Sequence, residues 1–293
     1  MIKLKAFAKI NFILQILGKR ADGYHEIDSL MQSVSLYDEI LVDKKKSGIE
    51  LFLNDPNIPN DKRNTAYKAA ELFFYKTKLE PSVKIDIRKN IPTEAGLGGA
   101  SSDAAAVLIG LNRLFDANLS EKELLELGAQ IGSDVSFCLT GGFCRCRGRG
   151  ELVEKIDNSG TKFCADETES YDGETKYYVL VKPKLSILTK SVYDSFEKSF
   201  IEKENYIDGF LQHGELVLKN DLEKVVLPKH HEIGEIKNRL LSLGCLQSLM
   251  SGSGSSVFGL VCDKKKAYEI CEEIKKKYSQ SFVVEGMNVG IKE

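Results

Sequence analysis

The 293-residue sequence lacks the patterns that mark several large classes of protein. No apolar run approaches the roughly 20 residues that a helix needs to cross a bilayer. The first predicted strand begins at Ile2, which leaves no room for a signal or transit sequence. The net charge of −2 gives no support for a nucleic-acid partner. We therefore expect a cytoplasmic protein that binds neither membranes nor nucleic acids.

The seven cysteines also lack the paired CxxC spacing of a zinc site. Cys144 and Cys146 form a lone CxC, which is a weak metal signal. An odd number of scattered cysteines favours reduced thiols in a cytoplasm over a disulfide framework. With 42% hydrophobic and 29% charged residues, a chain of this length has ample material for two domains or one large one.

The two commonest nucleotide-binding motifs are missing as well: there is no GxxxxGK[ST], and GLGGAS lacks the GxGxxG spacing. Residues 91–106 instead read IPTEAGLGGASSDAAA, in which a proline, three glycines and two serines precede an alanine-rich helix. Glycines let the backbone approach a ligand closely, and a helix N-terminus presents unpaired N–H groups. The segment therefore predicts an anion site, with phosphate as the usual ligand. The alternative is a glycine-rich turn between a strand and a helix.

Hydrophobic periodicity predicts an α+β protein. The strands predicted in the first half are residues 2–17, 30–36, 38–44, 49–53 and 83–89, with a strand or hairpin in GGFCRCRGRGE. The helices predicted there are residues 65–75, 102–115 and 121–130. The last of these helices is opened by a capping box, Ser120 with Glu123.

The second half shows the same mixture, with helices on one face of a sheet. Its predicted strands are residues 177–181, 247–250, 256–261 and 282–285, the last of which ends the chain. Its predicted helices are residues 189–200, 211–219, 231–243 and 264–278. A second glycine loop, SGSGSS, lies between two of the strands. Residues 157–176 are acidic and rich in turn formers, which indicates a loop, a linker or a disordered insert between the halves.

Three polar residues stand out in the first half. Lys9 and Asn11 share one face of the first strand, opposite an apolar face. They are either the solvent side of the sheet or, beside a phosphate loop, groups that neutralise a transferring phosphoryl group. Asp134, in QIGSDVSF, is either the N-cap of a short helix or a carboxylate that accepts a hydroxyl proton. These residues alone leave both alternatives open.

Two further candidates carry weaker signals. Tyr24 and His25 lie in KRADGYHEI, a turn-rich segment between two strands. An aromatic–histidine pair in such a place is more often packing than a ligand site. Asp103 more often starts a helix than binds a metal.

Five segments, in order, resemble the motifs of the GHMP small-molecule kinases, named for galactose, homoserine, mevalonate and phosphomevalonate. They are AKINFIL, GKRADGYHEIDSLMQSVSLYD, KNIPTEAGLGGASSDAA, IGSDVSF and MSGSGSSVFG. The likeness runs over nearly the whole chain, and DGYHEI is its most discriminating piece. It implies a ribosomal protein S5 domain 2-like N-terminal domain at 1–157, an acidic connecting loop at 158–176 and a ferredoxin-like C-terminal domain at 177–293.

The resemblance also implies a reaction. ATP, with Mg²⁺, would phosphorylate the 2-hydroxyl of a cytidine diphosphate-linked methylerythritol, a small-molecule substrate of non-mevalonate isoprenoid biosynthesis. The enzyme would be a monomer or a weak homodimer.

Site roles follow from the resemblance by motif position. Lys9 and Asp134 match the catalytic pair of the family, and Tyr24 and Tyr193 match two rings that enclose the cytosine. The other residues implied to contact the substrate are Asn11, His25, Thr189, Gly252, Ser253 and Gly254. Those implied to bind ATP are Pro92, Thr93, Glu94, Ala95, Gly96, Leu97, Gly98, Gly99, Ala100, Ser101 and Ser102, with Asn64 and Lys89. No metal ligand is assigned, although Ser102 is a candidate.

The sequence departs from the family pattern in three places. Ala100 stands where a third consecutive glycine is common, and its methyl group is tolerable only at negative φ. Ser136 and Cys138 replace the usual proline and phenylalanine after Asp134. The acidic stretch at 162–176 is longer than the usual connection between the domains.

Overall fold

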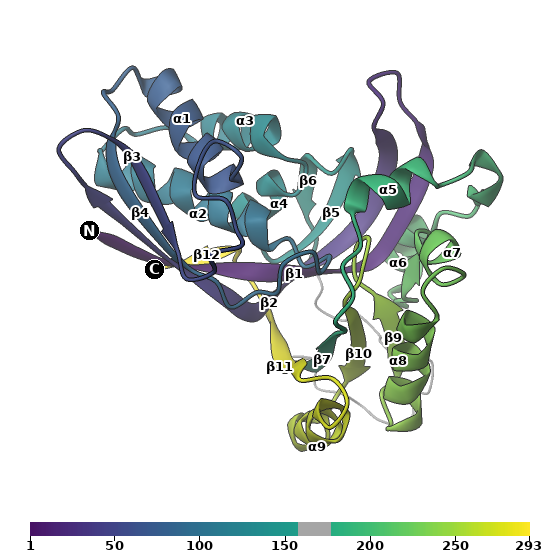
Figure 1. Ribbon diagram of the computed structural model, residues 1–293. Coiled ribbons are helices and arrows are strands. Elements are labelled where there is room, and N and C mark those ends of the chain that lie inside the picture. The colour runs from purple at the N-terminus through teal and green to yellow at the C-terminus, as the bar shows by residue number, and fades with distance from the viewer. Residues whose placement is uncertain (158–176) are drawn as a thin grey trace.

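The computed structural model describes residues 1–157 and 177–293, and the acidic segment predicted to connect the two halves lies outside these ranges. Helices and strands are mixed along the described chain, which confirms the predicted α+β class (Figure 1). No helix within these two ranges is long and apolar enough to span a membrane.

Two long antiparallel strands, β1 (Ile2–Lys19) and β2 (His25–Lys44), run through the molecule. The sequence predicted two separate strands in place of most of β2. The structure has one strand here. Its pairing with β1 shifts register where Phe7 pairs with Tyr37 but Ala8 pairs with Val34, and such a bulge bends a strand without ending its pairing. Lys9 and Asn11 are only 4% and 1% exposed, so the polar face of β1 does not face solvent.

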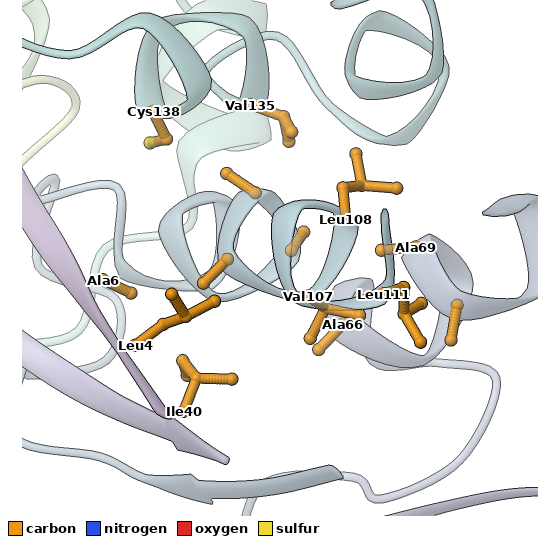
Figure 2. Packing of buried hydrophobic residues seen from close by; sticks show 14 of the residues in the cluster. Leu4, Ala6, Ile40, Ala66, Ala69, Val107, Leu108, Leu111, Val135 and Cys138 are labelled. Carbon is orange, nitrogen blue, oxygen red and sulfur yellow. The ribbon is translucent and has the colours of Figure 1, made fainter. Parts of the chain in front are cut away.

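A layer of helices covers one face of the N-terminal sheet (Figure 1). The shorter strands of this sheet are β3 (Gly48–Leu53), β4 (Ser82–Arg88), β5 (Phe143–Gly148) and β6 (Leu152–Lys155). The helices are α1 (Thr65–Thr77), α2 (Gly99–Leu114), α3 (Glu121–Ile131) and α4 (Val135–Thr140). Figure 2 shows Leu4 and Ile40 of the strands beside Val107 of α2, all fully buried. This packing holds α2 against the sheet.

The C-terminal half contains a second antiparallel sheet, ordered β11–β7–β10–β9. Its strands are β7 (Tyr177–Lys182), β9 (Gln247–Met250), β10 (Val257–Val261) and β11 (Gln280–Met287). Helices α8 (His231–Ser242) and α9 (Lys264–Lys275) bury their apolar sides against it. The other helical segments of this half are α5 (Thr189–Asp194), the 3₁₀ turn η1 (Lys198–Phe200), α6 (Tyr206–His213) and α7 (Glu223–Val226).

Three strands of the C-terminal half join it to the N-terminal sheet. β11 pairs with β2 at Gly286 and Val34. The two-residue strand β8 (Lys219–Asn220) pairs in parallel with β1, and β12 (Ile291–Lys292) pairs antiparallel with β1. The strand predicted at 282–285 is therefore not the last one, and the two halves share a continuous sheet.

Two helices predicted in the C-terminal half are wrong in extent. The helix predicted at 189–200 ends at Asp194, and η1 forms separately. The helix predicted at 211–219 is α6, which begins earlier because the Asn205 side chain accepts the N–H groups of Ile207 and Asp208. It ends at His213 because Gly214, with a φ of 72°, closes it in the left-handed conformation.

Candidate active site

A cavity of about 1010 Å³ is lined by residues from both halves of the molecule. Its walls include β1, the first glycine loop (Pro92–Gly98), the start of α2, helix α5 and the second glycine loop (Ser251–Gly254). The predicted site residues that line it are Lys9, Asn11, Tyr24, His25, Asn64, Lys89, Pro92, Thr93, Glu94, Ala95, Gly96, Leu97, Gly98, Gly99, Ala100, Ser101, Asp134, Thr189, Tyr193, Gly252 and Ser253.

Two predicted site residues do not line the cavity, Ser102 and Gly254. Ser102 is fully buried, and its hydroxyl donates a hydrogen bond of 2.8 Å to the carbonyl of Phe7. Ser102, the residue considered as a metal ligand, therefore holds α2 against β1. Gly254 ends the second glycine loop and faces Met250, whose sulfur would lie 2.8 Å from a Cβ at this position.

The first glycine loop leads directly into α2, which begins at Gly99 rather than at the predicted Ser102. Gly96 and Gly98 both have a φ of 71°, in the left-handed region that glycine adopts without strain. Ala100 lies in the first turn and has no positive φ, so its methyl group is accommodated. Ser102 is the first residue whose N–H bonds back to the loop, at the carbonyl of Gly98. The N–H groups of the preceding turn are therefore not used within the helix, as in the predicted anion site.

Lys9 and Asp134 lie together in this cavity. The Nζ atom of Lys9 is 3.5 Å from Oδ2 of Asp134 and 2.7 Å from Oδ1 of Asn11. Asn11 in turn donates a hydrogen bond of 2.9 Å to Ser29 on β2, so a chain of hydrogen bonds orients the ammonium group. Asp134 occupies the N-cap position of α4, yet its side chain makes no capping hydrogen bond. The contact with Lys9 thus favours a chemical role over a helix cap.

Three glycines allow the two glycine loops to meet at Lys9. A Cβ on Gly98 would lie 2.9 Å from Cγ of Lys9, and one on Gly252 would lie 3.1 Å from its Nζ. A Cβ on Gly96 would lie 2.1 Å from the carbonyl oxygen of Ser251. The Ser251 hydroxyl donates a hydrogen bond of 3.0 Å to the carbonyl of Gly96, which holds the loops together. Larger residues would push the loops and the lysine apart.

Aromatic rings line another part of the cavity. The rings of His25 and Tyr193 have centroids 5.5 Å apart at an interplanar angle of 41°. Tyr24, which also lines the cavity, is 51% exposed, so part of its ring is accessible to a ligand. The hydroxyl groups of Thr189 and Ser253 lie 2.8 Å apart and link α5 to the second glycine loop.

The surroundings shift the pKa of two of these rings. Burial lowers the pKa of His25, and the positive charge of Lys19 lowers it further, so the neutral imidazole is favoured. Burial raises the pKa of Tyr193, and the negative charge of Asp134 adds to that shift. Tyr193 and Asp134 line the same cavity.

Beneath the first glycine loop lies a buried ion cluster, Lys89 with Asp38 and Asp103. The ammonium group of Lys89 is 2.5 Å from Oδ2 of Asp38 and 2.6 Å from Oδ2 of Asp103. Asp38 also accepts the N–H groups of Asn90 and Ile91, which fixes the entrance to the loop. Burial would lower the pKa of Lys89, but the two carboxylates outweigh it and raise it. Burial raises the pKa of Asp103 to about 8 against the opposing charge of Lys89.

Several residues at or beneath this site were not predicted from the sequence. Ser29 and Asp38 act through Asn11 and Lys89, and no local pattern signals such contacts. Arg149 lies in the GRGE turn after β5, with its guanidinium group 5.0 Å from the centre of the Tyr24 ring. Further unpredicted polar residues of the cavity wall are Asp22, Arg63, Thr65, Asp103, Ser133, Lys190 and Asp194.

Comparison with known proteins identifies this architecture. The model for the GHMP kinases N terminal domain matches residues 64–142, and that for the GHMP kinases C terminal domain matches residues 207–280. A 4-diphosphocytidyl-2-C-methyl-D-erythritol kinase of Clostridium botulinum (strain Eklund 17B / Type B) is 40% identical over 290 residues, or 96% of this chain and 99% of the relative. The chain belongs to the GHMP kinases, in the 4-diphosphocytidyl-2-C-methyl-D-erythritol kinase family. It is therefore a small-molecule kinase.

Other relatives agree with this assignment of the kinase. The protein of the same name from Acetivibrio thermocellus is 40% identical over 296 residues, covering 97% of this chain and 98% of the relative. A crystal structure of 4-(cytidine 5'-diphospho)-2C-methyl-D-erythritol kinase matches with a TM-score of 0.80 at 30% identity, over 98% of this chain and all of that one. Homoserine kinase from Cytophaga hutchinsonii matches at 21% identity with a TM-score of 0.69, covering 99% and 96%, which shows the shared fold alone. The predicted GHMP fold is confirmed, and a kinase of this fold uses ATP.

Proposed function

We propose that this kinase transfers the γ-phosphoryl group of ATP to the 2-hydroxyl of 4-diphosphocytidyl-2-C-methyl-D-erythritol. The products are the 2-phosphate and ADP, and the step belongs to non-mevalonate isoprenoid precursor biosynthesis. The names of relatives at 40% identity support this substrate. The aromatic wall formed by Tyr24, His25 and Tyr193 supports it too, because a pyrimidine base binds well between flat rings.

The observation that carries the proposal is the Lys9–Asp134 contact of 3.5 Å inside a cavity that two kinds of surface line. The first glycine loop and the start of α2 would suit the phosphates of ATP. The aromatic rings would suit a nucleoside. A hydroxyl group bound at the Lys9–Asp134 pair would lie next to a base and a positive charge.

The chemistry then needs little beyond positioning. Asp134 would orient the acceptor hydroxyl and accept its proton late in the reaction. The hydroxyl oxygen would form a bond to the γ-phosphorus, while the bond between that phosphorus and the β–γ bridging oxygen breaks and ADP leaves. Lys9, held by Asn11, would keep Asp134 in place and stabilise negative charge on the transferred group.

ATP would bind at the first glycine loop. Pro92 to Ala100 would approach the phosphates through their backbone, and the N-terminus of α2 would add its partial positive charge. Asn64 and Lys89 would lie near the nucleotide. Gly252 and Ser253, in the second glycine loop, would cover the site from the C-terminal half.

The site also fits Mg²⁺, which usually accompanies ATP. Among the residues that the structure describes, no three acidic, histidine or cysteine side chains cluster as a metal site. An ion held mostly by phosphate oxygens needs no such cluster, because Mg²⁺ commonly uses only one or two carboxylates of the protein. The buried Oδ1 atom of Asp103, a residue of the cavity wall, has no hydrogen-bond partner in the parts of the chain that the structure describes and would supply an oxygen to such an ion. When bound, Mg²⁺ would neutralise part of the phosphate charge.

The domain division stays a proposal: an N-terminal domain at 1–157, a connecting loop at 158–176 and a C-terminal domain at 177–293. The contact of β12 with β1 means that residues 291–292 of the second domain complete the sheet of the first. We also propose that the kinase works in the cytoplasm, as a monomer or a weak homodimer.

Release of ADP from Mg-ATP tests the substrate. The acceptors would be 4-diphosphocytidyl-2-C-methyl-D-erythritol, homoserine and mevalonate, each at the same concentration. We expect turnover with the first acceptor only. Turnover with homoserine or mevalonate would leave the fold assignment intact but contradict a cytidine pocket, and no turnover with any acceptor would contradict the proposed reaction.

A further inference from the structure

One carboxylate oxygen beneath the first glycine loop has no partner. Asp103 is 4% exposed, and its Oδ2 atom accepts a hydrogen bond of 2.6 Å from Lys89. Its Oδ1 atom is buried and bonds to nothing in the described parts of the chain. A buried polar atom without a partner destabilises the folded protein, and a ligand bound in the cavity that Asp103 lines would supply that partner.

The position of this carboxylate follows from the geometry of α2. Helical side chains tilt toward the N-terminus, so the Asp103 carboxyl group lies back toward Gly99, where the helix begins. The Nζ atom of Lys89, which contacts Asp103, would lie only 3.4 Å from a Cβ on Gly99. Asp103 therefore reaches the same end of the helix that forms the anion site.

Charge within the cluster is unbalanced. Lys89 contributes one positive charge, whereas Asp38 and Asp103 together can carry two negative charges. Asp38 uses both of its oxygen atoms, one for Lys89 and one for the backbone at Asn90 and Ile91. The oxygen of the cluster that has no partner in the described chain is therefore Oδ1 of Asp103, next to a loop that must receive a polyanion.

We propose that Oδ1 of Asp103 is a ligand of the divalent cation that accompanies ATP in this cavity. The inference rests on the proposed function, since it presumes that ATP phosphates occupy the first glycine loop. An oxygen ligand of this kind suits Mg²⁺, which is commonly bound by one or two carboxylates together with phosphate oxygens. The cation replaces the proton that the carboxyl group otherwise retains, because metal ligands must be deprotonated. Lys89 holds the second oxygen and fixes the orientation of the carboxylate.

Binding of Mn²⁺ in place of Mg²⁺ tests this role without turnover. Electron paramagnetic resonance of free Mn²⁺ gives its dissociation constant with the whole protein and a non-hydrolysable ATP analogue. Asp103→Asn keeps the shape of the side chain and an oxygen for Lys89 but loses the charge. We expect this constant to rise roughly 10- to 100-fold, as for other losses at metal sites. Asp86→Asn on β4, outside the cavity wall, is the matched control and should leave it unchanged.

Two results would overturn the proposal. One is an unchanged Mn²⁺ constant in Asp103→Asn. The other is an equal weakening of nucleotide binding in that variant with and without metal, which would make Asp103 a hydrogen-bonding partner of the phosphates instead.

Lys89→Met supplies a second test that does not depend on the folding of Asp103→Asn. It removes the ammonium group that orients Asp103 but keeps the carboxylate itself, so Mn²⁺ binding should weaken less than in Asp103→Asn. If Asp103 served only to hold Lys89, both variants would weaken Mn²⁺ binding alike, and the proposal would fail. Because no acceptor substrate is present, a failure here is separate from a failure of the proposed reaction.

Discussion

Replacement of Asp134 by asparagine should separate catalysis from folding in this kinase. The substitution preserves the size of the side chain and its place at the start of α4. It removes the charge that lies 3.5 Å from Nζ of Lys9 and the ability to accept a proton. Because the Asp134 side chain makes no capping hydrogen bond, no helix loses its cap.

The two effects differ in size. A positioned general base contributes about 10²- to 10⁴-fold to the rate, or about 3–5 kcal/mol of barrier. The ion pair with Lys9 contributes less to stability, because Asp134 is 29% exposed and Lys9 keeps its hydrogen bond to Asn11. We expect about 1 kcal/mol or less in the free energy of unfolding. The loss of kcat should thus far exceed any loss of folded protein.

The assay is steady-state turnover with saturating Mg-ATP and cytidyl substrate, alongside urea unfolding of the same preparations. Asp86→Asn, a carboxylate on β4 away from the cavity, is the control for removing a negative charge. A kcat within threefold of wild type in Asp134→Asn would refute the assignment of Asp134 as the base. A large fall in the free energy of unfolding of Asp134→Asn would contradict the expectation that this substitution lowers catalysis without destabilising the fold.

Three further changes follow from the structure. Gly98→Ala should lower kcat at least tenfold, because the new Cβ would lie 2.9 Å from Cγ of Lys9 and the φ of 71° at this position disfavours a side chain. Turnover of the purified variant measures this effect. His25→Gln should flatten the fall of the melting temperature between pH 7.5 and 5.5. Burial holds the pKa of His25 below the usual value of about 6.5. As the pH falls, the unfolded chain therefore binds a proton at this residue before the folded protein does, and acid destabilises the folded form. An equal fall of the melting temperature in the wild type and in His25→Gln would contradict this. Leu111→Ala, at a fully buried position of α2, should cost about 2–5 kcal/mol of unfolding free energy in urea titrations while leaving the KM for ATP near wild type in the folded fraction.

Much of the fold and part of the site could be predicted because their signals are local. The alternation of residues 2–17 predicted β1, and the capping box of Ser120 and Glu123 is present at the start of α3. The glycines before α2 predicted an anion loop because residues without a Cβ let the backbone approach a ligand closely. The motif order then predicted that Lys9 and Asp134 belong together, and the structure places them in contact.

What could not be predicted depends on contacts between distant residues. Lys89 and Asp38 are 51 residues apart, and neither has a neighbour in sequence that signals the pairing. Strands β8 and β12 have two residues each, which is too short to show an alternating pattern. The residues alone also left the role of Asp134 open, because its position fits a helix cap equally well, and the catalytic role was implied by the resemblance. The side-chain contact with Lys9 favours that role over a helix cap.

The pairing of β12 with β1 bears on how the kinase folds as it is synthesised. Lys5 and Ala6 pair with Lys292 and Ile291. The ribosome therefore synthesises β1, which carries Lys9, long before its neighbour β12. Contacts of such wide sequence separation slow folding, since the loop between them must close first. Until β12 has been synthesised, one edge of β1 in the N-terminal half would stay unpaired at Lys5 and Ala6. Such an edge invites association between nascent chains, so this kinase would depend on chaperones most in that interval.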